Sequence, residues 1–457
     1  MPVDKTTLQS KLTAALGNTT NTTVPSEVLG LILSAKAIDT QNISVVSTSA
    51  SLPDLGLYNS PDSVLTFIND TGIFAISSNT KWISLDGRLI RDDYNYGITY
   101  SWGYNNTGRL GDGTTVNKSS PVSVIGGFTD WCQVSAGGGH SLGVRTNGTA
   151  WAWGPATAGR LGDGTAVNRS SPVSVVGGFT DWCQVSAGGV HSLGVRTNGT
   201  AWAWGQNCRL VNGGGFLGDG TTVSKSSPVS VIGGFTDWCQ VSGGDSHSLG
   251  VRTNGTAWAW GSNRNFTLGD GTSVNKSSPV SVIGGFTDWC QVSAGYSHSL
   301  GVRTNGTAWA WGSNDYGMLG DGTIGFTVSP VSVVGGFTNW CRVSAGRYYS
   351  LGVRTNGTAW AWGSNCFGQL GDGTTVNKSS PVLVVGGFTD WCQVSAGFCH
   401  SLGVRTNGTA WAWGRACCGL LGDGTTVDKS SPISVIGGLT YWCQVSAGAY
   451  HSLGLKY

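Results

Sequence analysis

Apolar and polar side chains alternate along the stretch from Asp130 to Gly154, DWCQVSAGGGHSLGVRTNGTAWAWG. In Trp131–Ala136 every second residue is apolar from Cys132 onward, and in Ala150–Trp153 two alanines alternate with two tryptophans. A period of two is typical of β-strands. Between the second and third segments, Asn147 and Gly148 favour a tight hairpin in which both central residues have a positive φ. The stretch therefore predicts three antiparallel strands.

The same stretch returns in near-copies at a spacing of 51 residues, with one step of 56. The Trp-Cys pairs begin at residues 131, 182, 238, 289, 340, 391 and 442. A fixed period of this length indicates a solenoid or a propeller. A fourth apolar segment, Pro121–Val124, follows the turn Leu110–Gly113, and four antiparallel strands make a propeller blade. Tryptophans on one face and alanines on the other suit blades that stack face against face.

The two ends of the repeated region are complementary fragments. Gly97–Gly103, GITYSWG, matches the third strand of the other copies but has no Trp-Cys strand before it. The last copy stops at Tyr457, after its second strand. We therefore expect Ile98–Trp102 to pair antiparallel with Ser452–Lys456, which would close the ring and remove open sheet edges.

The repeat resembles that of the RCC1 family. The residues that carry the resemblance are the Ser-Ala-Gly-x-x-His-Ser turn, the Trp-Gly that precedes a variable loop, and the Leu-Gly-Asp-Gly that follows it. The resemblance covers about residues 96–457 and implies a seven-bladed β-propeller. The expected fold is all-β, an RCC1-like propeller over 96–457 closed by its N- and C-terminal strands and preceded by a small α+β domain over 1–95.

Residues 1–95 lie outside the repeat. Leucines spaced four apart predict a short helix over Leu8–Leu16, and a second helix is expected over Val28–Ala37. Three strands are expected at Val64–Ile68, Ile73–Ser77 and Lys81–Leu85. In general appearance the region is similar to N-terminal segments of virion structural proteins of tailed phages, and the alternative is a plain capping domain.

Composition excludes several classes of protein. The net charge is +2 and 11% of the residues are charged, so no basic face for nucleic acid is expected. No run of 18 apolar residues is present, so no membrane span is expected. The start of the sequence does not have the pattern of a signal peptide, which indicates synthesis in a cytoplasm. The seven repeated cysteines are interpreted as small buried thiols. Cys399, Cys417 and Cys418 fall in variable loops of one blade. Cys399 could therefore form a disulfide with Cys417 or Cys418, and the alternative is that all three are free thiols.

No residue is expected to be catalytic, and no metal or cofactor is expected. The six histidines occupy the same place in six copies, and Tyr349 replaces the histidine in the remaining one. A site repeated around a ring is too wide for one ion, so these histidines are interpreted as structural. The repeated aspartates of Leu-Gly-Asp-Gly lack further acidic ligands at calcium-binding spacing and are interpreted as turn residues.

Two windows differ between copies while the rest of the unit is nearly identical. The first window is the pair of residues after Ser-Ala-Gly, or after Ser-Gly-Gly in the third copy: Gly138-Gly139, Gly189-Val190, Asp245-Ser246, Tyr296-Ser297, Arg347-Tyr348, Phe398-Cys399 and Ala449-Tyr450. The second window follows Trp-Gly: Tyr104–Arg109, Pro155–Arg160, Gln206–Phe216, Ser262–Thr267, Ser313–Met318, Ser364–Gln369 and Arg415–Leu420. Variation confined to two loops indicates a binding surface, and the alternative is that exposed loops simply drift. The Thr-Asn-Gly-Thr turns are expected to be exposed too and do not vary, which speaks against drift.

Strand parity places both windows at one end of the propeller, which we call the top face. If the first strand runs toward the top, the first window follows it there, the second strand runs down, and the third strand brings the second window back to the top. Aromatic and arginine side chains suit recognition surfaces. The predicted binding residues are Tyr104, Arg109, Arg160, Phe216, Asp245, Arg264, Phe266, Tyr296, Tyr316, Arg347, Tyr348, Phe367, Phe398, Arg415 and Tyr450.

These observations favour a virion or extracellular appendage protein whose propeller binds a host cell-surface receptor or glycan. Residues 1–95 would then attach the chain to other virion or appendage proteins or form a homo-oligomer. The alternative is an intracellular RCC1-like interaction scaffold or guanine-nucleotide exchange factor. One plant member of the family senses ultraviolet light through tryptophans beside Gly-Trp-Arg-His-Thr turns, and turns such as Gly138–His140 depart from that pattern.

Overall fold

The computed structural model describes residues 97–209 and 213–457, together with short strands at 43–46, 64–68, 73–78, 81–84 and 89–92. The chain divides into two compact units, Met1–Asn95 and Tyr96–Tyr457. In the described ranges no helix has the length and apolar character that crossing a membrane requires.

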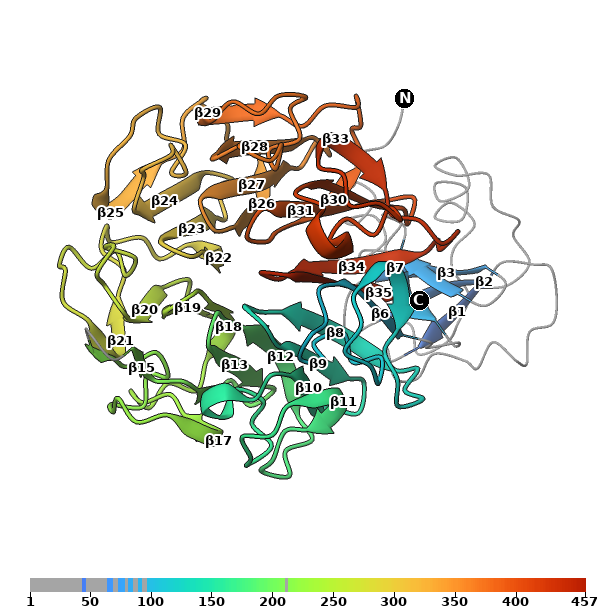
Figure 1. The fold of residues 1–457 in the computed structure, drawn as a ribbon, viewed down its shortest axis with the longest axis horizontal. Coiled ribbons are helices and arrows are strands. Elements are labelled where there is room, and N and C mark those ends of the chain that lie inside the picture. The colour runs from blue at the N-terminus through green and yellow to red at the C-terminus, as the bar shows by residue number, and fades with distance from the viewer. Residues whose placement is uncertain are drawn as a thin grey trace. The chain divides into compact units, whose positions relative to one another are not determined.

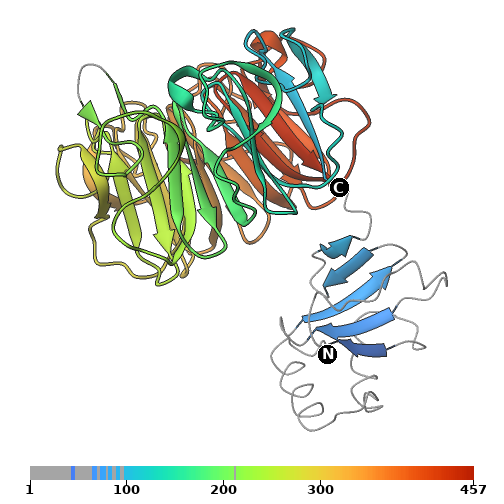
Figure 2. The ribbon, with the colours of Figure 1, turned by 90° about the horizontal axis from the view of Figure 1, so that it is seen from below.

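The second unit is a ring of seven four-stranded antiparallel sheets, which are the blades of a propeller (Figure 1). Seen from the side, the strands run across the thickness of the ring (Figure 2). Six blades each use four strands that follow one another along the chain, and we number these blades in chain order. The first three blades consist of β8 (Trp131–Ala136), β9 (Ser141–Arg145), β10 (Ala150–Gly154) and β11 (Arg169–Ser174); β12 (Trp182–Ala187), β13 (His191–Arg196), β14 (Ala201–Gly205) and β17 (Lys225–Ser230); and β18 (Trp238–Gly243), β19 (His247–Arg252), β20 (Ala257–Gly261) and β21 (Lys276–Ser281). The fourth to sixth blades consist of β22 (Trp289–Ala294), β23 (His298–Arg303), β24 (Ala308–Gly312) and β25 (Thr327–Ser332); β26 (Trp340–Ala345), β27 (Tyr349–Arg354), β28 (Ala359–Gly363) and β29 (Lys378–Leu383); and β30 (Trp391–Ala396), β31 (His400–Arg405), β32 (Ala410–Gly414) and β33 (Lys429–Ser434). Small additions in the second windows are the strand pair β15 (Cys208–Arg209) and β16 (Gly213–Gly214) and the 3-10 turns η3 (Thr157–Gly159) and η4 (Cys417–Gly419).

The seventh blade is built from both ends of the repeated region, as predicted. Its order is β34 (Trp442–Ala447), β35 (His451–Lys456), β6 (Ile98–Gly103) and β7 (Lys118–Ser123). β35 pairs antiparallel with β6, so that Ser452 lies opposite Trp102 and Lys456 opposite Ile98. This pairing gives the seventh blade the same four strands as the others and closes the ring.

The hairpin between the second and third strands is not the predicted type. Gly148 has a φ of 73°, but Asn147 does not have a positive φ. The amide of Gly148 donates to the carbonyl of Arg145, and Asn147 Oδ1 accepts from the amide and hydroxyl of Thr149. The loop is therefore a turn followed by one left-handed glycine, in which only Gly148 needs its conformational freedom.

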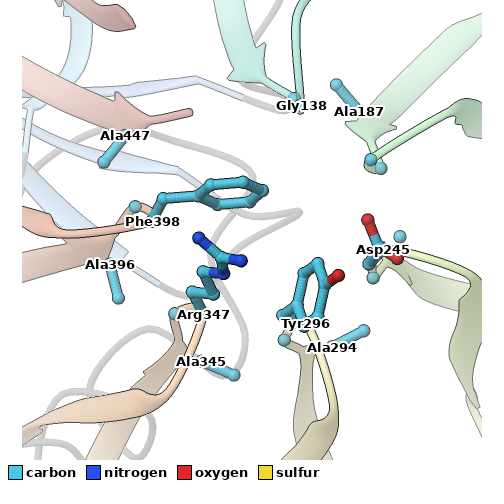
Figure 3. Close-up of a pocket in the computed structure, with 18 of the residues that line it drawn as sticks. Gly138, Ala187, Asp245, Ala294, Tyr296, Ala345, Arg347, Ala396, Phe398 and Ala447 are labelled. Atoms are coloured by element: carbon cyan, nitrogen blue, oxygen red, sulfur yellow. The ribbon is translucent and has the colours of Figure 1, made fainter. Parts of the chain in front are cut away.

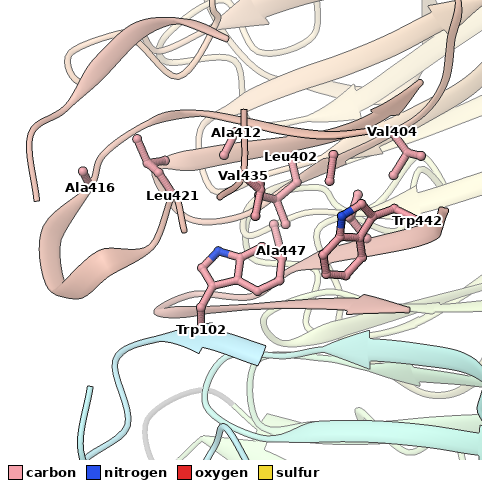
Figure 4. Packing of buried hydrophobic residues seen from close by; sticks show 11 residues of the cluster. Trp102, Leu402, Val404, Ala412, Ala416, Leu421, Val435, Trp442 and Ala447 are labelled. Carbon is pink, nitrogen blue, oxygen red and sulfur yellow. The ribbon is translucent and has the colours of Figure 1, made fainter. Parts of the chain in front are cut away.

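Between neighbouring blades, large aromatic side chains pack against small aliphatic ones. Trp102 and Trp442 of the seventh blade face Leu402, Val404 and Ala412 of the sixth (Figure 4). Each of the seven blade interfaces holds a cluster of this kind. The predicted stacking of tryptophan faces on alanine faces is confirmed.

Glycine makes room for one of these tryptophans inside its own blade. A Cβ at Gly143 would lie 2.6 Å from Cζ3 of Trp131. The His-Ser-Leu-Gly segment therefore requires glycine at this position because the indole ring of the tryptophan packs directly over it. The backbone there has ordinary strand geometry and does not itself require glycine.

The repeated cysteines are not buried, because each occupies a β-bulge. Trp131 pairs with Arg145 and Gln133 with Val144, which leaves Cys132 as the extra residue. Its thiol donates to the carbonyl of Val144 and is exposed. Five of its equivalents are also exposed and one is partly buried: Cys183, Cys239, Cys290, Cys341, Cys443 and, partly buried, Cys392. All twelve cysteines, Cys399 included, are free thiols.

In the first unit the described strands form one sheet in the order β1 (Ile43–Val46), β2 (Val64–Ile68), β3 (Ile73–Ser78), β4 (Lys81–Ser84) and β5 (Leu89–Asp92). β1 pairs parallel with β2, and the other neighbours are antiparallel. The two helices predicted before residue 40 lie outside the described residues. The attachment or oligomerisation role predicted for 1–95 stays a prediction.

Candidate functional site

A closed ring of main-chain hydrogen bonds holds the first windows around the propeller axis. In each blade the amide of the first window residue donates to the carbonyl of the glycine that precedes the window in the next blade. The seven bonds, of 2.9–3.3 Å, are Gly138 to Gly188, Gly189 to Gly244, Asp245 to Gly295, Tyr296 to Gly346, Arg347 to Gly397, Phe398 to Gly448 and Ala449 to Gly137. Because only main-chain atoms take part, this position can vary without loss of the ring.

The second windows lie directly beside the first. The amide of Tyr104 donates to the carbonyl of Tyr450, and the amide of Ser364 donates to that of Tyr348. Equivalent bonds join Gln206 to Val190, Ser262 to Ser246, Ser313 to Ser297 and Arg415 to Cys399. Both windows therefore lie on the same face, as strand parity predicts. That this face binds a partner remains a prediction.

Six aromatic residues of the windows form a continuous series of ring contacts, which we call the aromatic arc. Its members are, in order of contact, Tyr316, Tyr348, Tyr296, Phe398, Tyr450 and Tyr104, with ring centroids 5.2–6.3 Å apart. Tyr316 and Tyr450 are exposed, and the others are half-buried. The arc spans the fourth to seventh blades. No single copy of the repeat contains all of its residues, because the contacts join different copies.

Arg347 lies within this arc at the mouth of the central channel (Figure 3). Its guanidinium carbon is 5.1, 4.9 and 5.1 Å from the ring centroids of Tyr296, Tyr348 and Phe398. Such contacts hold the cation through the ring quadrupoles. Arg347, Tyr296 and Phe398 also border a cavity of about 100 Å³, which is lined by the alanines and glycines that end the innermost strands.

The opposite side of the mouth has little side-chain bulk. Gly138 and Gly189 carry none there, and Asp245 supplies a carboxylate that accepts from Ser246 Oγ at 2.8 Å. Figure 3 shows Phe398 and Arg347 on the side of the mouth opposite Asp245, with Tyr296 between Arg347 and Asp245. The mouth is thus aromatic and basic on one side, and open and acidic on the other.

Three further predicted residues form separate pairs. Arg415 lies 4.9 Å from the ring of Phe367. Phe266 stacks on Phe326 at 4.4 Å, and Arg264 is exposed on the same loop. Phe326 is 63% exposed and was not predicted, because it lies outside both windows. The available signal was the segment Thr323–Phe326, which departs from the Thr-Thr-Val-Asn of other copies.

Two of the predicted residues are largely buried. Arg109 is 6% exposed and Phe216 is 1% exposed. Both precede a Leu-Gly-Asp-Gly turn, and their carbonyls accept hydrogen bonds from serines of the adjoining blade, Ser141 and Ser248. In these two copies the last position of the second window packs inside the blade interface. Phe216 is therefore a core residue.

The histidines are buried between blades. Nε2 of His140 lies 2.8 Å from Oγ of Ser192, and this hydroxyl donates to the carbonyl of Arg160. Burial lowers the pKa of His247, His298 and His400 to about 3, and places those of His140 and His451 well below the ordinary value. Where the chain is described, no group of His, Cys, Asp and Glu has the arrangement of a metal site.

The repeated aspartates organise their own turns. Asp112 Oδ1 accepts from the amide and hydroxyl of Thr114 and from Nδ2 of Asn105, and Lys118 lies 3.5 Å from Oδ2. These contacts agree with the interpretation of the repeated aspartates as turn residues.

The model of the Regulator of chromosome condensation (RCC1) repeat matches residues 96–144, 147–195, 254–302, 305–353, 356–404 and 407–455. A second model of that repeat matches 182–209, 238–266, 289–317, 340–369 and 391–420. The chain is 30% identical to the ultraviolet-B receptor UVR8 of Arabidopsis thaliana over 73% of this chain and 77% of the receptor. It is also 30% identical to the mouse (Mus musculus) E3 ubiquitin-protein ligase HERC2, over 64% of this chain but 6% of that protein.

Among solved structures, the propeller is similar to Prp20p of Saccharomyces cerevisiae. The TM-score is 0.71 at 20% identity, over 79% of this chain and 93% of Prp20p. Human WBSCR16 gives a TM-score of 0.69 at 19% identity, over 79% and 98% of the two chains. At this identity the likeness concerns the fold. None of these relatives is described as a virion protein, so the host-attachment hypothesis gains no support from them.

Proposed function

Because the chain belongs to the RCC1 repeat family, we propose that it is a protein-interaction propeller that binds its partner on the top face, where the two windows lie. The observation that carries this proposal is the aromatic arc with Arg347 at its centre. Aromatic and arginine side chains in a partly desolvated cluster are the usual anchors of protein interfaces.

The distribution of differences between copies supports the same face. The strands and the Asn-Gly turns at the other end are repeated almost unchanged, while the windows give each blade a different surface. The main-chain ring fixes the first windows in place, so a partner would meet a rigid set of side chains. A preorganised surface loses little conformational entropy when it binds.

We also propose that the chain binds without catalysing a reaction. Its histidines and repeated aspartates are engaged in blade contacts and turns, respectively. The family resemblance raises guanine-nucleotide exchange as the alternative activity. A nucleotide-release assay with a small GTPase separates the two, since accelerated release by catalytic amounts of the chain would refute a purely binding role.

The test uses residues that the chain itself places at equivalent positions. In a top-face variant, Phe398→Asp and Tyr348→Ser give the sixth and fifth blades side chains that the third blade carries as Asp245 and Ser246. A control variant, Thr253→Asp with Thr304→Ser, makes the same change of charge at exposed turns on the opposite face.

Immobilised wild-type chain and both variants are incubated with extract from the cells that make the protein, and bound proteins are quantified by mass spectrometry. We expect a protein captured by wild type and by the control to be lost from the top-face variant. If the control loses that protein and the top-face variant keeps it, the partner binds the other face and the proposal is wrong.

A further inference from the structure

Two arginines of neighbouring blades converge on Gly139, a buried residue that has no side chain. A Cβ atom placed on Gly139 would lie 3.8 Å from Nη1 of Arg160 and 4.0 Å from Nη1 of Arg109. The third neighbour of that position is Cγ of Pro155, at 3.3 Å. The space that a side chain would occupy is therefore bordered by two guanidinium groups.

This arrangement occurs once in the ring. Arginine occupies the last position of the second window only at 109 and 160, in adjacent blades, and the other copies have Phe216, Thr267, Met318, Gln369 and Leu420 there. Gly139 is likewise the one glycine at its window position, where the other copies carry Val190, Ser246, Ser297, Tyr348, Cys399 and Tyr450. Gly139 has no positive φ, so its backbone does not require glycine.

Neither guanidinium has an anionic partner. Nη2 of Arg109 donates to Asn106 Oδ1 at 2.8 Å and to Thr107 Oγ1 at 2.9 Å, while its buried Nε has no hydrogen-bond partner. Arg160 donates to main-chain carbonyls, from Nε to Thr157 at 3.2 Å and from Nη1 to Gly189 at 3.5 Å. Within the described residues, no carboxylate forms an ion pair with either.

Two cations so placed are unfavourable without a counter-charge. Burial lowers the pKa of Arg109, and burial together with the charge of Arg109 lowers the pKa of Arg160 to about 10. The rings of Tyr104 and Tyr450, 4.8 and 5.8 Å from the guanidinium carbon of Arg109, hold that group in place. The cost of burying both charges falls when an anion joins them.

We infer that Arg109 and Arg160 form an oxyanion-binding site over Gly139, which accepts the carboxylate or phosphate group of an acidic or phosphorylated segment of the partner. Guanidinium groups present paired N–H donors that match both kinds of oxyanion. The anion would neutralise the two charges, and the missing side chain of Gly139 provides the room for it. That the anion belongs to a partner protein depends on the proposed function. The existence of the oxyanion site depends only on the arrangement of Arg109, Arg160 and Gly139.

The test measures anion binding by the full chain without any partner. Inorganic phosphate and, separately, acetate are titrated by calorimetry at low ionic strength, where screening is weak. Gly139→Val fills the space with the side chain that the next copy has at Val190 and keeps both charges. Arg160→Gln removes one charge, and Arg415→Gln removes the same charge from the pair with Phe367 as a control.

We expect phosphate to bind the wild type and the Arg415→Gln variant alike, and to bind Gly139→Val and Arg160→Gln at least about tenfold more weakly. Binding of acetate as well would indicate a carboxylate as the natural group, and binding of phosphate alone would indicate a phosphorylated one. The site is refuted if neither anion binds, if Gly139→Val binds like wild type, or if Arg415→Gln weakens binding equally. A chain that binds phosphate but captures no protein would refute the proposed function alone.

Discussion

Nε2 of His451 lies 2.8 Å from Oγ of Ser141, a residue 310 positions earlier in the chain. The Ser141 hydroxyl donates to the carbonyl of Arg109 at 2.9 Å, so the imidazole must donate from Nε2. Nδ1 of His451 is then a buried acceptor without a partner. The contact continues around the ring at 2.8–3.0 Å in the pairs His140 with Ser192, His191 with Ser248, His247 with Ser299, His298 with Ser350 and His400 with Ser452.

These histidines predict that the propeller loses stability in mild acid. Burial holds the folded-state pKa of His247, His298 and His400 at about 3, whereas an unfolded chain titrates near 6.5. The unfolded state therefore binds more protons between these values, and the free energy of unfolding falls as pH falls from about 6.5 toward about 3. Each histidine contributes about 1.4 kcal/mol per pH unit within that range. Urea unfolding measured between pH 7.5 and pH 4.5 checks this.

The fifth blade supplies the control for the acid effect. There Tyr349 donates from its hydroxyl to the carbonyl of His400, and no imidazole titrates at that position. In His298→Tyr we expect a shallower dependence of unfolding free energy on pH, by about one proton. An unchanged slope in this variant would show that acid sensitivity arises elsewhere.

One blade interface lacks a contact that the other six have. Gln291 Oε1 accepts from the amide of Val343 and its Nε2 donates to the carbonyl of Val343, in the next blade. Arg342 stands where the fifth blade would have this glutamine, and the residue equivalent to Val343 in the next blade is Val394. We expect Arg342→Gln to raise the free energy of unfolding by roughly 1–2 kcal/mol, the net worth of two hydrogen bonds. The reciprocal Gln291→Arg should lower it, and equal stabilities in chemical denaturation would contradict the argument.

The bulge cysteines predict a pattern of thiol reactivity in the folded chain. Cys132 and Cys443 are exposed as residues, but their thiol groups are partly desolvated. This desolvation raises the pKa of both thiols, that of Cys443 to about 12. Because the thiolate is the reactive form, modification by iodoacetamide should be slow at pH 8, rise with pH, and be slowest at Cys443. Peptide mass mapping over time measures the rates, and fastest modification of Cys443 would refute this order.

The sequence predicts the strands, the ring closure and the shared face of the windows because each depends on periodicity and strand direction alone. Side-chain exposure depends on contacts between blades, which no single repeat contains. Cys132 shares the alternation of Val134 but is turned outward by a bulge, and Phe216 lies in a variable window but packs between blades. The arc from Tyr316 to Tyr104 likewise joins residues of different copies.

The closing pair β35–β6 gives the most direct test of the fold. Deletion of residues 451–457 removes β35, which pairs with both β34 and β6, and removes the buried side chains of Leu453 and Leu455. Loss of one buried leucine costs about 2–5 kcal/mol, and a whole domain is stable by only about 5–15 kcal/mol. The truncated chain should therefore lose cooperative unfolding and aggregate through its unpaired strand edges. Deletion of Tyr457 alone leaves β35 complete and serves as the control. Circular dichroism during heating and size-exclusion chromatography follow the two outcomes, and a monomeric truncated chain with the unfolding midpoint of the control would show that the ring does not depend on this strand.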